Sequence, residues 1–107
     1  MKPILANCIE ALNADLLKFH LSKDPRQVHS LNKNKESLLH ILAMRRAVGP
    51  AELASFEQIA DMLFGLNVDP NLPNAFGNTP IDLAEVYAPH FVKPLTTYMS
   101  KFESDKF

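Results

Sequence analysis

The stretch of sequence that decides the fold is NLPNAFGNTPIDLA, which runs from Asn71 to Ala84. Gly77 indicates a tight turn, and Thr79-Pro80 opens the apolar run that follows it. A threonine side chain can accept a hydrogen bond from an amide of the first helical turn. Proline suits the first helical position because its missing N–H would have no partner there. The stretch therefore predicts a tight turn followed at once by a capped helix.

A similar arrangement occurs earlier in the chain. The polar segment 32–36 leads into Ser37-Leu38-Leu39-His40 and a further apolar run. Ser37 stands where Thr79 stands later, and His40 stands where Asp82 stands, at a spacing of 42 residues. The sequence therefore predicts two related units, each with a turn and a capped helix.

The run Thr79-Pro80-Ile81-Asp82-Leu83-Ala84 resembles the Thr-Pro-Leu-His-x-Ala core of the ankyrin repeat, a unit of about 33 residues with a turn and two helices. Asn67-Val68-Asp69-Pro70-Asn71 matches that family's closing turn, Gly-Ala-Asp-x-Asn. The resemblance implies an all-α ankyrin-repeat solenoid of about three helix-turn-helix repeats. The resemblance also implies a single domain, 1–107, with repeats at 1–31, 32–73 and 74–107. The first repeat fits least well and is typical of an N-terminal cap, whose outer side faces water.

The middle repeat is longer than the family pattern by nine residues, because its spacing is 42 instead of about 33. The register of the closing turn places this insertion between the two helices, within Arg46 to Phe56. Gly49-Pro50 breaks the chain there, and apolar residues recur at three- or four-residue steps afterwards. We expect a short loop at 46–50 and one long second helix at roughly 51–65.

The outer repeats are predicted from the spacing of apolar residues. Helical spacings over 4–12 and 15–21 predict a helix pair, with Leu16 and Leu17 in the core of its second helix. Pro25 should end that helix, and an extended arm should lead on to the next unit. In the third repeat Ala88-Pro89 should start the second helix. Pro94 lies inside it, so this helix either starts near His90 or kinks.

Composition places the chain among ordinary globular proteins. It has 107 residues, of which 47% are hydrophobic and 21% are charged, and this suits one soluble domain. The net charge of −1 offers no basic surface for nucleic acid. Charge is uneven, however: residues 1–31 sum to +1, 32–56 to +2 and 57–107 to −4. The middle of the chain is therefore mildly basic and its C-terminal half acidic.

Membrane spans and targeting signals are also absent from the pattern. No apolar run approaches the roughly 20 residues that span a bilayer, so we expect no membrane association. Asn7, Glu10 and Asn13 interrupt any signal-peptide core. The sequence leaves the location unknown: the cytoplasm is the default, and the periplasm or exterior applies if a signal peptide has been removed.

The sequence gives no positive sign of catalysis, so no catalytic residue, metal or cofactor is predicted. Its four histidines lack the spacing of a zinc motif; they are His20, His29, His40 and His90. Cys8, the only cysteine, lies on an apolar helix stripe, which favours a buried hydrophobic role over a nucleophilic one. Three glycines supply no phosphate loop. The family resemblance instead assigns His40, and Asp82 after it, a hydrogen bond to the turn backbone of a neighbouring repeat.

The resemblance also implies where a partner protein would bind. In ankyrin-repeat proteins the turn tips and the inner helices form a concave binding surface. By position, the candidate partner-binding residues here are Lys33, Lys35, Glu36, Met44, Arg45, Arg46, Ala47, Val48, Ala75, Phe76, Asn78, Glu85 and Tyr87. Two alternatives stay open: Phe76 either contacts a partner or packs over the adjacent arm, and Arg45-Arg46 is either a binding element or a solvated helix end.

These features predict a protein, monomeric when free, that binds one specific partner protein. The partner is expected to be an enzyme from the same cell, which the chain would inhibit stoichiometrically in a self-protection or immunity role. The insertion in the middle repeat would then be the plug that occludes the enzyme. The alternative is an ankyrin scaffold or adaptor without inhibitory activity. A hydrolase-like enzyme is a third class, and it would require a metal.

Overall fold

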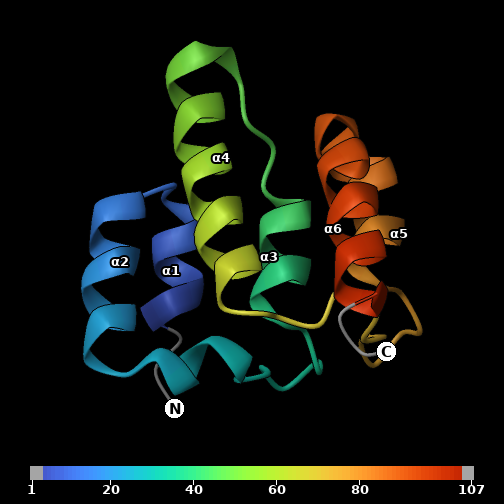
Figure 1. Cartoon of the computed structure of the whole chain (residues 1–107). Coiled ribbons are helices and arrows are strands. Elements are labelled where there is room, and N and C mark those ends of the chain that lie inside the picture. Colours follow the sequence, from blue (N-terminus) through green and yellow to red (C-terminus); the bar gives the residue numbers. More distant parts are fainter. Residues whose placement is uncertain (1–3, 105–107) are drawn as a thin grey trace.

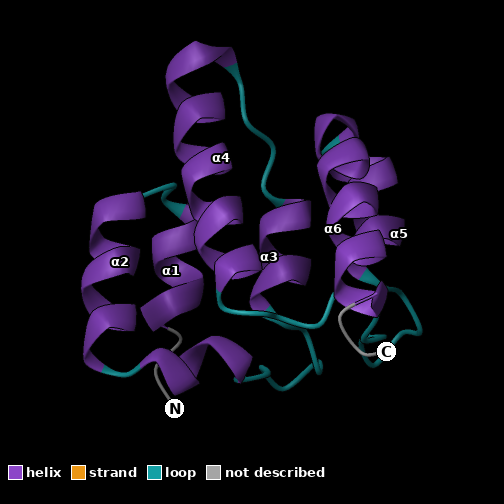
Figure 2. Cartoon of the chain, in the orientation of Figure 1, coloured by secondary structure: helices purple, strands orange, loops and turns teal. Residues whose placement is uncertain are grey.

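The structure, a computed structural model, describes residues 4–104. These residues form α-helices and short 3-10 helices and contain no β-strand (Figure 2). The elements in chain order are α1 (Ile4–Glu10), α2 (Ala14–Lys23), η1 (Pro25–His29), α3 (Leu38–Met44), α4 (Gly49–Gly65), α5 (Pro80–Tyr87), η2 (Pro89–Phe91) and α6 (Val92–Ser104). The all-α fold class is therefore confirmed.

The helices form three pairs that stand side by side (Figure 1). In chain order they are α1 with α2, α3 with α4, and α5 with α6. In one layer α3 packs against both α1 and α5, and in the other α2 packs against α4. We call α1, α3 and α5 the inner helices and α2, α4 and α6 the outer helices. Each loop that precedes α3 or α5 lies at the same end of the inner layer.

The inner helices α3 and α5 begin with the same reciprocal cap. The Ser37 hydroxyl accepts a hydrogen bond from the amide of His40, and the His40 ring accepts one from the amide of Ser37. The Thr79 hydroxyl accepts one from the amide of Asp82, whose carboxylate accepts the amide of Thr79. A cap of this kind satisfies two backbone donors that a helix start leaves free. Pro80 occupies the first turn, as the sequence predicted.

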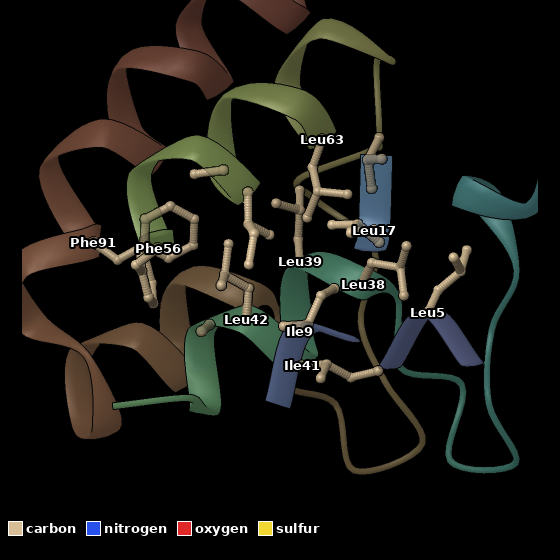
Figure 3. Packing of buried hydrophobic residues seen from close by; sticks show 14 of the residues in the cluster. Leu5, Ile9, Leu17, Leu38, Leu39, Ile41, Leu42, Phe56, Leu63 and Phe91 are labelled. Carbon is tan, nitrogen blue, oxygen red and sulfur yellow. The ribbon is translucent and has the colours of Figure 1, made fainter. Parts of the chain in front are cut away.

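The core lies between the two layers. Apolar side chains from α1, α3 and α4 meet there, and the rings of Phe56 and Phe91 join α4 to the third pair at a centroid distance of 4.9 Å (Figure 3). The ring of Phe64 stacks on that of Tyr98 at 4.2 Å. The Tyr98 hydroxyl donates to the Val68 carbonyl at 2.7 Å, which ties α6 to the segment that closes the second pair.

Burial is what stabilises this packing. The largest fully buried hydrophobic side chains are Phe56, Phe91, Ile9, Leu17, Leu39, Leu42, Ile59, Leu63, Leu95, Val28 and Val68. Each contributes about 1.5–3 kcal/mol by leaving water. The core is therefore continuous from the first pair to the third.

The structure corrects two predictions for the first unit. The segment expected to be an extended arm contains η1, whose first turn is capped because the Asp24 carboxylate accepts the amide of Arg26. Leu17 is fully buried, but Leu16 is 43% exposed and does not belong to the core. Phe19 is also exposed, and the Lys23 ammonium lies 4.5 Å from its ring centroid.

The helix bounds in the second and third units also differ from those expected. α4 begins at Gly49, two residues earlier than predicted, and Pro50 suits its first turn. The loop of the insertion is correspondingly short. The second helix of the last pair, α6, begins at Val92 after the 3-10 turn η2. Pro94 therefore lies in the first turn of α6, where a missing amide is tolerated.

Among residues 4–104, no helix combines the length and the apolar character that crossing a membrane requires.

Candidate protein-binding surface

The loops before α3 and α5 are built alike. The Asn32 side-chain oxygen accepts the amides of Asn34 and Glu36, and the Asn74 side-chain oxygen accepts those of Phe76 and Asn78. The Asn32 amide donates to the Glu36 carbonyl, as the Asn74 amide does to the Asn78 carbonyl. We call residues 32–36 the first tip and residues 74–78 the second tip.

The register between the tips is 42 residues at every position compared. Lys35 has a φ of 60° and Gly77 a φ of 82°, so the left-handed residue falls at the same place in both. Side-chain capping of backbone amides by asparagine is what lets such a turn hold its shape without a sheet. The two tips are therefore one structural motif used twice.

Two hydrogen bonds join the unit that carries the first tip to the unit that carries the second tip. The amide of Ala75 donates to the carbonyl of Asn34 at 2.8 Å, which sets the tips side by side. The His40 Nε2 lies 2.9 Å from the carbonyl oxygen of Asn78. Because His40 Nδ1 accepts the amide of Ser37, the proton is on Nε2, and Nε2 donates to Asn78. His40 thus makes the contact with a neighbouring turn that the sequence assigned to it.

The environment of His40 keeps the ring neutral. Burial lowers the pKa of His40 below its usual value, and the bond to the Asn78 carbonyl opposes this more weakly. A neutral imidazole can accept at one nitrogen and donate at the other, which is what this junction uses. The position is structural, and it aligns the two tips.

The tips present the residues that the sequence proposed for binding. Lys33 and Lys35 are exposed on the first tip. Phe76 on the second tip is 72% exposed, so it does not pack over the adjacent arm. Ala75 and Asn78 are also exposed, although the backbone of both is committed to the bonds above. Glu36 is half-buried and accepts a hydrogen bond from the Asn32 side-chain amide at 2.9 Å.

A hollow of about 730 Å³ lies between the first tip and the helices α1 and α3. It brings together four of the predicted residues, Lys33, Glu36, Met44 and Arg45. The first pair supplies its other wall through Asn7 and Glu10. The sequence missed these two because the first repeat matches the family too loosely for positions to be carried over.

Arg45 anchors the insertion and is not a solvated helix end. Its Nε donates to the Glu10 carbonyl at 2.7 Å, and its guanidinium lies 3.8 Å from the Glu52 carboxylate. The same carboxylate accepts the amide of Val48 at 3.0 Å. These contacts tie the loop to the end of α1 and to the first turn of α4. Arg46 is exposed, Ala47 is half-buried and Val48 is 70% exposed.

The end of α5 carries a further exposed group. Glu85 is exposed, Tyr87 is 49% exposed and Val86 is 71% exposed. Val86 was not predicted, although the register supplied the signal: it stands 42 residues after Met44, which was. Met44 is half-buried and lines the hollow beside α1, whereas Val86 is exposed.

Asp82 does not bond to a neighbouring turn as His40 does. Its carboxylate accepts the amide of Thr79 at 3.0 Å within its own cap, and its side chain is exposed. The resemblance implied a bond to a neighbouring turn, but no further turn follows α5 and α6 within residues 4–104. His40 and Asp82 differ because a described unit follows α3 and none follows α6.

The groups considered for catalysis or metal binding are dispersed. Cys8 is buried, and burial raises the pKa of its thiol, which is opposite to what a nucleophile needs. His90 packs edge-on against Phe56 and His20 against Phe19. Within residues 4–104 no three residues of the types His, Cys, Asp and Glu are grouped so as to hold a metal ion.

Comparisons with known proteins add no identity. No family model matches the chain, and neither the curated proteins nor the solved structures contain a match to it.

Proposed function

We propose that this chain is an ankyrin-repeat protein that binds one partner protein through its tips and inner helices. The observation that carries the proposal is the duplicated tip, with the same asparagine hydrogen bonds and the same left-handed position 42 residues apart. A tip that recurs and hydrogen-bonds to its neighbour is a way of aligning side chains along one surface. Lys33, Lys35 and Phe76 are the exposed side chains that it aligns.

The chemistry of these side chains suits protein recognition. An aromatic ring that is 72% exposed has apolar surface to lose from water when a partner arrives. Aromatic residues dominate binding energy in many interfaces, and exposed lysines steer an oppositely charged partner. The hollow beside the first tip offers a concave site of about 730 Å³ next to them.

We further propose that the partner is an enzyme of the same cell and that the insertion occludes its active site. The supporting observation is that the insertion is held at its base while two of its side chains are exposed. Arg45 and Glu52 fix both ends of the loop, yet Arg46 is exposed and Val48 is 70% exposed. In Figure 1 the insertion and the start of α4 rise beyond the end of α3. A fixed, protruding loop loses little conformational freedom when it enters a cleft.

Affinity capture from the source cell, followed by mass spectrometry, tests the binding proposal. The tip variant Lys33→Glu/Lys35→Glu/Phe76→Ser should lose the partner that the intact chain captures. A matched control, Lys93→Glu/Lys101→Glu on α6, should keep it, because those lysines lie on an outer helix. Capture of the same partner by the tip variant and the intact chain would refute binding through the tips.

A second comparison tests inhibition. The variant Arg46→Ala/Val48→Ser leaves Arg45 and Glu52 in place and so keeps the loop anchored. If the insertion is the plug, the captured enzyme should be inhibited by the intact chain and active in the presence of this variant. An enzyme that is equally active with both proteins identifies an adaptor instead. Metal found by elemental analysis of the purified chain would favour the hydrolase class.

A further inference from the structure

The side of α5 that faces away from α3 presents different chemical groups from the side of α3 that faces α5. These groups indicate the chemistry of a ligand that could bind there. At the junction α3 meets a following unit through three features: the Asn34 carbonyl, the His40 ring and the face of α3 that carries Ala43. The register of 42 residues places Phe76, Asp82 and Glu85 at the same three positions on the last unit. No described element packs beyond α5 (Figure 1).

The three equivalent positions lie on one exposed face. His40 and Ala43 are three residues apart on α3, so they share the face that α5 covers. Both are fully buried there. Asp82 and Glu85 keep the same spacing on α5, and both are exposed. We call Phe76, Asp82 and Glu85 the end face, and Val86, which is also exposed, follows Glu85 on α5.

The hydrogen-bond polarity of the end face is reversed relative to the junction. His40 Nε2 donates to a carbonyl of the following tip. Asp82 uses one oxygen for the Thr79 amide and offers the other as an acceptor only. The Phe76 carbonyl, like that of Asn34, is an acceptor, and no donor among residues 4–104 reaches it. The free acceptors of the end face can therefore bind only groups that donate a hydrogen bond.

The negative charge of the end face also favours a ligand that carries hydrogen-bond donors. Where Ala43 lets an apolar helix pack closely, Glu85 places a carboxylate. A further unit of the kind seen here would bury this carboxylate without a partner, and its tip carbonyl would face Asp82. Both changes oppose stacking of another repeat, since an unpaired buried charge is costly. They favour a segment that carries cationic donors.

We propose that the end face binds a basic segment of the partner protein, with arginine or lysine side chains on Asp82 and Glu85. Arginine donates in pairs to carboxylates and packs on aromatic faces. Phe76 is 72% exposed and Val86 is 71% exposed, so they supply apolar surface for the stems of such side chains. This inference deepens the proposed function, because it gives the partner a chemistry at one end of the binding surface.

A peptide titration tests the inference without the partner. The probes are two blocked eight-residue peptides, one alternating arginine with valine and one alternating glutamine with valine. Each is added to the intact, nitrogen-15-labelled chain. The arginine peptide should shift the backbone amides of residues 76–78 and 81–86, and the glutamine peptide should not.

Substitutions that keep the fold locate the site. Asp82→Asn keeps an acceptor for the Thr79 amide, so α5 stays capped. Asp82→Asn and Glu85→Gln should each weaken arginine-peptide binding about three- to fivefold, as for solvated ion pairs, and the double variant about tenfold. Glu57→Gln, which alters an exposed carboxylate on α4, is the matched control and should leave binding unchanged.

The outcomes separate this inference from the proposed function. Equal shifts with both peptides, shifts spread over exposed acids such as Asp15 and Glu57, or unchanged binding by the double variant would each overturn the basic-segment inference. The capture experiment repeated with Lys33→Glu/Lys35→Glu alone changes no residue of the end face and is independent of that result. Loss of capture by this double variant together with no arginine-peptide binding would retain the proposed function alone.

Discussion

His40 Nε2 donates to the carbonyl of Asn78, at 2.9 Å and across 38 residues of chain, and the same ring accepts the amide of Ser37. One buried side chain therefore caps α3 and fixes the position of the second tip. Only a neutral imidazole does both, because a protonated ring has no acceptor.

We expect stability to fall as the pH drops below about 6.5. Burial lowers the pKa of His40 in the folded chain, so the unfolded chain binds the proton more readily. Stability then rises with pH until the unfolded histidine is also neutral, with a slope of at most about 1.4 kcal/mol per pH unit. Urea unfolding between pH 5 and pH 8 measures this. His40→Gln, which has a side chain that does not titrate, should lose most of the pH dependence, and an identical dependence in both proteins would contradict it.

Removing the His40 ring altogether should be costly at neutral pH. His40→Ala leaves the Ser37 amide and the Asn78 carbonyl without their partners and opens a cavity in a fully buried position. The expected loss is about 2–4 kcal/mol in the free energy of unfolding. Ser30→Ala provides a comparison outside the junction, and a loss from His40→Ala no larger than from that change would be inconsistent with the role given to His40.

The left-handed positions of the tips predict opposite effects for two substitutions. Lys35 has a φ of 60°, which glycine adopts without strain, so Lys35→Gly should stabilise the chain by up to about 1 kcal/mol. Gly77 has a φ of 82°, and a Cβ there would meet nothing within 4 Å. Gly77→Ala should therefore destabilise by about 1 kcal/mol through backbone strain alone. Thermal unfolding of both variants checks the signs, and two changes of the same sign would refute the common geometry.

Tyr98 predicts a loss of stability at alkaline pH. Its hydroxyl donates to the Val68 carbonyl, and burial, with a contribution from Asp69, raises the pKa of Tyr98 to about 12. The unfolded tyrosine loses its proton near pH 10, so stability attributable to Tyr98 decreases as the pH rises from about 10 to about 12. Tyr98→Phe should remove this decrease while costing about 1–2 kcal/mol at pH 7. Tyr87→Phe, at a position 49% exposed, is the control and should behave like the original chain.

Arg45 predicts a local effect on the insertion. Arg45→Ala removes the bond to the Glu10 carbonyl and the ion pair with Glu52, both at partly exposed positions. We expect a loss of about 1 kcal/mol in global stability and faster hydrogen exchange at residues 46–50. Arg46→Ala, at an exposed neighbour, is the matched control and should leave exchange unchanged. Equal exchange in the two variants would show that Arg45 does not anchor the loop.

Local signals along the chain predicted the α-helices of the fold, but not η1, which was expected to be an extended arm. Thr79-Pro80 and Ser37 predicted helix starts, and the structure caps both helices there. The 42-residue register between Ser37 and Thr79 predicted an insertion between two helices, and α4 follows a loop at that place. Caps, proline positions and apolar spacing act within a few residues, so they can be recognised from the sequence without knowledge of tertiary contacts.

Side-chain exposure could not be predicted in the same way. Leu16 and Leu17 are adjacent leucines in α2, yet one is exposed and the other is fully buried, because only one face of α2 meets α4. Arg45 and Arg46 are likewise adjacent, and only the first reaches the end of α1. Which of two neighbours is covered depends on the elements that pack there.

By itself the sequence determined the repeated unit, its capped helices and the place of its insertion. Only the tertiary structure showed which copy of the unit is covered by a neighbouring unit within residues 4–104. His40 and Asp82 occupy one position in the motif, but His40 is covered by the next unit and Asp82 is exposed. The physical reason is that a hydrogen bond between units needs a second unit, and its presence is a property of the packed chain and not of the motif.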